Sequence, residues 1–123
     1  MRARRRKHWG WGYEDEQPSP HELRSTAAFL AEHLGFGSIV IEPFVPLSEV
    51  SLPAPRLRVG QRLSEICFVE DYERALHATG SSYRDVVRGF RGRFDHPPDV
   101  VAVPAASQSW WRSSTGHWAP GPR

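Results

Sequence analysis

The chain has 123 residues, enough for one domain, and a loop-rich composition with 39% hydrophobic residues, 11 prolines and 10 glycines. Its formal net charge of +2 gives no strong electrostatic clue, and its single Cys67 excludes an internal disulfide or a CxxC metal site. No apolar run is long enough to cross a bilayer or to form a signal peptide, so we expect a cytoplasmic protein without a transmembrane segment.

The chain begins with RARRRK, and we expect residues 1–7 to form a disordered basic leader. Such a run can contact phosphates, so a peripheral membrane contact stays open. No groove-reading helix, zinc spacing or aromatic ribonucleoprotein motif accompanies it, so we expect no nucleic-acid binding. The stretch HWGWGYEDEQPSP that follows predicts an ordered loop, because it is rich in glycine, proline and aromatic residues.

The strongest predicted helix is SPHELRSTAAFLAEHLG. Ser19 can cap its start, Pro20 suits the first turn, and Gly35 can end it. One face carries apolar residues at helical spacing: Leu23, Ala27, Leu30 and Leu34. The pattern indicates an amphipathic helix that needs a partner surface.

Residues 39–57 contain four prolines, which exclude a central strand or a long helix and favour an extended connector. Three short helices are expected next, in 59–69 (VGQRLSEICFV), 69–80 (VEDYERALHATG) and 81–94 (SSYRDVVRGFRGRF). The last of these has a serine cap and is expected to continue as far as Gly89.

Residues 98–106, PDVVAVPAA, predict a buried strand that is apolar on both faces, as in a covered or parallel sheet. One strand cannot satisfy its own backbone groups, so we expect an unpaired edge and a marginally stable chain. The predicted fold class is an α+β fragment. Its helical arm, residues 8–97, has extended proline-rich connectors and leads into this strand.

No catalytic constellation is visible in the sequence. HELRS at 21–25 has serine where HExxH requires histidine, and GSSY at 80–83 is not a GxSxG elbow. GFGS at 35–38 lacks the GxGxxG spacing, and the acidic run at 14–16 fits a solvated loop face better than a carboxylate pair. We therefore expect no catalytic residue and no metal ligand.

Two stretches nevertheless carry a family resemblance. KHWGWGYEDE, residues 7–16, resembles the entry motif of the alkyldihydroxyacetonephosphate synthase family, which are FAD-dependent proteins related to the vanillyl-alcohol-oxidase and glycolate-oxidase flavoproteins. LPAPRL at 52–57 and the segment 71–106, which ends in PDVVAVPAA, are similar to later parts of the same family in the same order.

The resemblance implies that the strand 98–106 opens an FAD-binding α+β domain. In the family a helix and a glycine-rich loop follow, and the loop holds the flavin pyrophosphate. Pro104 is the one residue here that matches a position near the cofactor. Trp9 and Trp11 either line the entrance to a lipid site or pin the arm to the FAD domain, and we favour the second interpretation.

The implied function is that of an N-terminal fragment of an FAD-binding oxidoreductase or alkyldihydroxyacetonephosphate synthase-like flavoprotein. Both ether-lipid synthesis and hydroxy-acid oxidation stay open. We expect the fragment to bind no cofactor and to be inactive alone, with the separately encoded remainder of the enzyme as its partner. The alternative is a free-standing, non-enzymatic interaction module that binds a partner protein or a lipid surface.

The last residues, SWWRSSTGHWAPGPR, depart from the family pattern. Permitted codons from Trp110 onward, read from the last base of the Ser109 codon, can encode VVAVLDWALGAGAA, which has the apolar helix and LDW signature of the family. We therefore expect residues 107–123 to be an out-of-frame tail that truncates the flavoprotein. The alternative is a genuine tail that packs its tryptophans on the strand.

Sequencing the nucleotides across the codons for residues 105–110, and the frame downstream, tests the frameshift. We expect flavoprotein sequence to continue in the neighbouring reading frame, and its absence there would rule the frameshift out.

Overall fold

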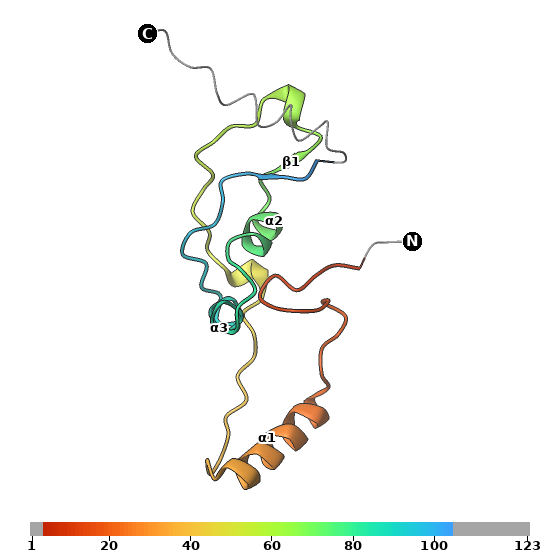
Figure 1. Ribbon diagram of the computed structural model, residues 1–123, viewed down its shortest axis with the longest axis vertical. Helices are drawn as coiled ribbons and strands as arrows, with labels where there is room; N and C mark the ends of the chain where they lie inside the picture. The colour runs from red at the N-terminus through yellow and green to blue at the C-terminus, as the bar shows by residue number, and fades with distance from the viewer. Residues whose placement is uncertain (1–3, 105–123) are drawn as a thin grey trace. The chain divides into compact units, whose positions relative to one another are not determined.

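A computed structural model describes residues 4–104 of the chain (Figure 1). Its elements are α1 (Pro20–Leu34), the 3-10 turns η1 (Leu47–Glu49) and η2 (Gln61–Leu63), β1 (Cys67–Phe68), α2 (Asp71–Leu76), α3 (Tyr83–Phe90) and β2 (Val101–Ala102). The first compact unit holds the described residues up to Val50 together with Ser81–Arg93. The second holds Ser51–Gly80 with the described residues from Phe94 onward. The predicted α+β class is confirmed.

Helix α1 begins and ends where its local signals predict. The Ser19 hydroxyl accepts a hydrogen bond from the Glu22 amide at 3.2 Å, and the Glu22 carboxylate accepts one from the Ser19 amide at 2.7 Å. The second bond stabilises the charged carboxylate and lowers the pKa of Glu22. Gly35 ends the helix at φ 67°, in the left-handed region that glycine adopts without strain.

The apolar face of α1 has no cover among residues 4–104. None of its residues is buried, and Leu23, Leu30 and Leu34 are 39%, 37% and 57% exposed. The partner surface that this face requires is therefore not part of the described chain.

Helix α3 continues beyond the expected end at Gly89. Ser82 caps its start through the Asp85 amide, as predicted, but the terminating glycine is Gly92, with φ 70°. The Gly92 amide donates to Gly89 O at 2.9 Å and the Arg93 amide donates to Arg88 O at 2.9 Å, the paired bonds of a Schellman ending. The prediction that the helix ends at Gly89 was wrong, because Gly89 lies inside the helix and provides room for the backbone of Trp9.

Gly89 allows the N-terminal loop to lie directly on α3. It is buried, and a Cβ atom built on it would lie 3.0 Å from both the Cα and the carbonyl oxygen of Trp9. The Val45 amide donates to Phe90 O at 2.9 Å and brings the connector onto the same helix. Three segments that are distant in sequence therefore meet at the C-terminal half of α3.

The second unit contains a two-stranded antiparallel sheet in which Cys67 pairs with Ala102 and Phe68 with Val101. The predicted helix over 59–69 is wrong at its C-terminal half, because only the turn η2 forms and β1 follows it. The run ICFV consists of β-branched and aromatic residues together with Cys67, a composition that favours a strand once a partner is available.

Strand β2 is shorter than the predicted strand over 98–106. It is antiparallel to its partner, and Val103 is 50% exposed, so neither a parallel sheet nor cover on both faces is present in residues 4–104. Its edge toward β1 is paired, and the Val103 amide extends the pairing by donating to Ile66 O at 2.8 Å.

Arg74 is the most buried large side chain of the described residues, with 1% of its surface exposed. Its Nη2 donates to Pro53 O at 2.6 Å and its Nε to Pro98 O at 2.8 Å, and Nη1 lies 3.4 Å from an Asp71 carboxylate oxygen. One guanidinium on α2 therefore joins the connector to the segment that leads into β2. The two carbonyls belong to Pro53 and Pro98, which lie outside the helices and strands of the described chain.

Replacing Arg74 by lysine should destabilise the chain by about 2–4 kcal/mol, because an ammonium cannot reach both proline carbonyls and leaves at least one without its donor. Urea unfolding followed by circular dichroism measures the change. Arg56→Lys is the matched control: the Arg56 side chain is 87% exposed and pairs with Asp99 at 3.1 Å, so the loss should be below about 0.5 kcal/mol. Equal losses in the two variants would contradict the role of Arg74.

Replacing Gly89 by alanine should destabilise the first unit by about 1–3 kcal/mol despite the better helix propensity of alanine, because the Trp9 backbone must move. Gly60 supplies the control, since its φ of −70° suits alanine and nothing lies within 4 Å of the added Cβ. Gly60→Ala should be neutral or should stabilise by up to about 1 kcal/mol in the same urea titration. A neutral Gly89→Ala would show that the loop does not lie on α3.

Candidate functional site

Residues 4–16, which include the stretch KHWGWGYEDE, form a loop whose two sides are joined by backbone hydrogen bonds. Arg6 and Tyr13 form an antiparallel bridge, the Lys7 amide donates to Gly12 O at 3.2 Å, and Gly12 turns the chain at φ 81°. The Glu14 amide donates to Arg5 O at 2.9 Å. The part of the expected disordered leader that the structure describes, residues 4–7, thus forms one side of this loop.

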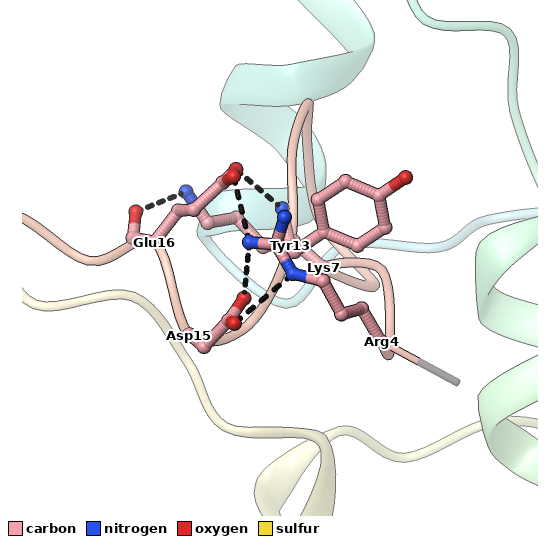
Figure 2. A network of polar contacts seen from close by, with 5 residues as sticks. All are labelled: Arg4, Lys7, Tyr13, Asp15 and Glu16. Atoms are coloured by element: carbon pink, nitrogen blue, oxygen red, sulfur yellow. Dashed lines mark hydrogen bonds and ion pairs between the residues drawn. The ribbon is translucent and has the colours of Figure 1, made fainter. Parts of the chain in front are cut away.

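Opposite charges close the loop at its open end (Figure 2). The Arg4 guanidinium donates to both carboxylate oxygens of Asp15, at 3.1 and 2.8 Å, and to Glu16 at 2.7 Å. It also lies 4.2 Å above the centre of the Tyr13 ring. These hydrogen bonds raise the pKa of Arg4 and lower the pKa values of Asp15 and Glu16.

The basic run and the acidic run are therefore partners. Arg5 also lies 3.5 Å from a Glu14 carboxylate oxygen, and Lys7 Nζ donates to Glu16 O at 3.0 Å, as Figure 2 shows for the lysine. From the sequence we did not predict that the two runs pair with each other. Their positions on either side of the glycine-rich turn are the feature from which the pairing could have been predicted. Because the ion pairs are exposed, they contribute little stability.

Trp9 and Trp11 have different environments. The Trp9 ring stacks on Phe44 with centroids 5.7 Å apart and meets Phe90 edge-on at 5.0 Å. Trp11 is 57% exposed, and its indole N–H donates to Ser81 O at 3.0 Å. Trp9 thus anchors the loop within the first unit, whereas more than half of the Trp11 side chain is exposed to solvent. The predicted roles of the two tryptophans at an FAD domain or at a lipid entrance stay predictions.

His8 is a buried polar residue that the sequence analysis did not single out. Its Nε2 donates to Val45 O at 3.1 Å and its ring meets Phe44 edge-on at 6.3 Å. Burial lowers the pKa of His8, so the imidazole is neutral at pH 7. We therefore interpret His8 as a structural residue that links the loop to the connector through a hydrogen bond, and not as an acid–base catalyst.

Pro104, the predicted cofactor-binding residue, follows β2 and is partly exposed. It has no amide hydrogen, and the Val103 amide before it is already bonded to Ile66 O. Residues 105–106 of the predicted strand and the predicted out-of-frame tail, 107–123, lie outside the described residues.

The described residues contain neither a cluster of metal-ligating side chains nor a helix that could span a membrane. No three His, Cys, Asp or Glu side chains come together there in a way that could hold a metal ion. None of the helices between residues 4 and 104 has the length and apolar character needed to cross a membrane.

No family model matches the sequence, and the comparison with curated proteins found no match. Solved structures of alkyldihydroxyacetonephosphate synthase in P1 and in P212121 crystals do match the fold, with TM-scores of 0.65 and 0.64 and 18% sequence identity in each case. They cover 87% and 86% of this chain, which spans 25% and 24% of the synthase chains. The resemblance read from the sequence is thereby confirmed at the level of the fold: this chain folds like about a quarter of an alkyldihydroxyacetonephosphate synthase.

Proposed function

We propose that this chain is the N-terminal part of an FAD-dependent flavoprotein of the alkyldihydroxyacetonephosphate synthase type. In that enzyme it forms the helical arm and the opening strand of the FAD-binding domain. The observation that carries the proposal is the structural similarity over 87% of the chain. The order of the WGWGY loop and the PDVVAVP strand supports it independently, because that order is a property of the sequence alone.

The described residues do not fit the flavin phosphates by themselves. A pyrophosphate is bound by several free backbone amides at a helix start or in a glycine-rich loop. After β2 the described chain offers one amide, that of Val103, and it is used by Ile66 O. Pro104 adds none. The phosphate-binding groups of the proposed enzyme therefore come from polypeptide outside residues 4–104, and we propose that residues 4–104 are not catalytic alone.

The exposed apolar face of α1 supports the proposal that this chain packs against further polypeptide. Leu23, Leu30 and Leu34 lie on one face and expose more than a third of their surface. In the proposed enzyme this face packs against the separately encoded remainder. We assign the whole enzyme to ether-lipid synthesis rather than hydroxy-acid oxidation, because the two solved structures compared above are synthases.

The second candidate is a free-standing interaction module without enzymatic activity. The same exposed face of α1, together with the exposed Trp11 ring, favours it, since large exposed apolar groups mark protein contacts. The two candidates differ in what the partner is and in whether a flavin accompanies the complex.

Co-expression with the product of the downstream reading frame separates them. For the flavoprotein we expect the two chains to co-purify as a yellow complex whose flavin is released on denaturation. The chain alone, incubated with FAD, is the control and should stay colourless. Two independently soluble products without flavin would overturn the proposal and leave the interaction module.

A further inference from the structure

Helix α3 carries a row of arginines on the side away from the loop. Arg84, Arg88 and Arg91 are spaced four and three residues apart, so they share one face, and Arg93 follows at the helix end. The opposite face holds the packing contacts: Gly89 lies on Trp9, Phe90 meets the Trp9 ring, and the Cβ position of Gly10 is 3.3 Å from Val86. We name Arg84, Arg88, Arg91 and Arg93 the arginine row.

Little of this charge is neutralised within residues 4–104. Arg91 lies 3.6 Å from a Glu42 carboxylate oxygen, and both side chains are more than half exposed. Arg84, Arg88 and Arg93 have no ion pair or side-chain hydrogen bond within the described chain. The row differs in this from the basic run at the N-terminus, where Arg4 and Arg5 face carboxylates.

The end of α3 is also fixed in position. The Schellman bonds from Gly92 and Arg93 hold the backbone after the helix, so Arg93 stays close to Arg88 in sequence and in space. A row whose backbone is ordered loses less conformational entropy on binding than the same charges on a loose segment.

An exposed aromatic ring accompanies the row. Tyr83, the first residue of α3, is 75% exposed and directly precedes Arg84. Arginine, tryptophan and tyrosine are the residues enriched in the energetic centres of protein interfaces. A membrane is a poorer occupant, since the apolar side of α3 is already packed and cannot enter the acyl region.

We propose that the arginine row is a docking surface for a carboxylate-rich protein surface. Each guanidinium can bind a carboxylate through two parallel hydrogen bonds, and the exposed ring of Tyr83, next to Arg84 in the sequence, supplies apolar contact area. The assignment does not depend on the flavoprotein proposal, because it uses only contacts within the first unit.

Binding to poly-L-glutamate at low salt tests the surface, with phosphatidylserine-containing vesicles and poly(U) RNA as competing probes. The triple variant Arg84→Gln, Arg88→Gln, Arg93→Gln should bind poly-L-glutamate roughly tenfold more weakly than the unaltered chain. The matched control is Arg24→Gln, Arg58→Gln, Arg62→Gln, which removes the same charge from exposed arginines elsewhere and should change binding less than about twofold.

Equal losses in both triple variants would overturn the proposal, since they would show a response to net charge alone. Tighter, row-dependent binding to vesicles or to poly(U) would assign the row to a membrane or to RNA instead, and absence of binding to all three probes would remove the surface altogether. Because Arg88 is half-buried, the double variant Arg84→Gln, Arg93→Gln guards against a folding defect. It should keep the circular dichroism of the unaltered chain and still bind poly-L-glutamate more weakly.

Discussion

The buried guanidinium of Arg74 is the interaction on which the second unit depends. Few apolar side chains are buried in the described residues, so hydrophobic burial offers little to hold two extended, proline-rich segments in place. Arg74 supplies directional bonds to the Pro53 and Pro98 carbonyls, which have no partner in a helix or sheet ladder. The short sheet of β1 and β2 adds a second link within the same unit.

The first unit uses a different device. There the absence of a side chain at Gly89 lets the backbone of Trp9 lie on α3, and the Trp9 ring fills the space between Phe44 and Phe90. His8 and Val45 add hydrogen bonds from the same two segments. The motif WGWGY is thus explained by packing: the first tryptophan is an anchor, the second is presented outward, and Gly12 makes the turn that permits both.

Charge is also arranged more specifically than the net value of +2 suggests. Arg4 and Arg5 form ion pairs with the acidic run of the same loop, so their charge is less available to bind anions of another molecule. The charges of Arg84 and Arg88 on α3 stay available. A partner that recognises charge would therefore meet α3 rather than the N-terminal run, which reverses the emphasis that composition alone would give.

The sequence by itself determined the features whose causes lie within a few residues: the Ser19 and Ser82 caps, the Gly35 ending of α1, the connector in 39–57, and the α+β class. It also carried the resemblance to the synthase fold. Only the tertiary structure decided the rest. Cys67 and Phe68 became a strand because β2 lies beside them, and position 89 requires glycine because the Trp9 backbone lies where a Cβ atom would meet it. Arg74 was an ordinary helix arginine in the sequence, since its two carbonyl partners lie 21 and 24 residues away and no local pattern predicts them.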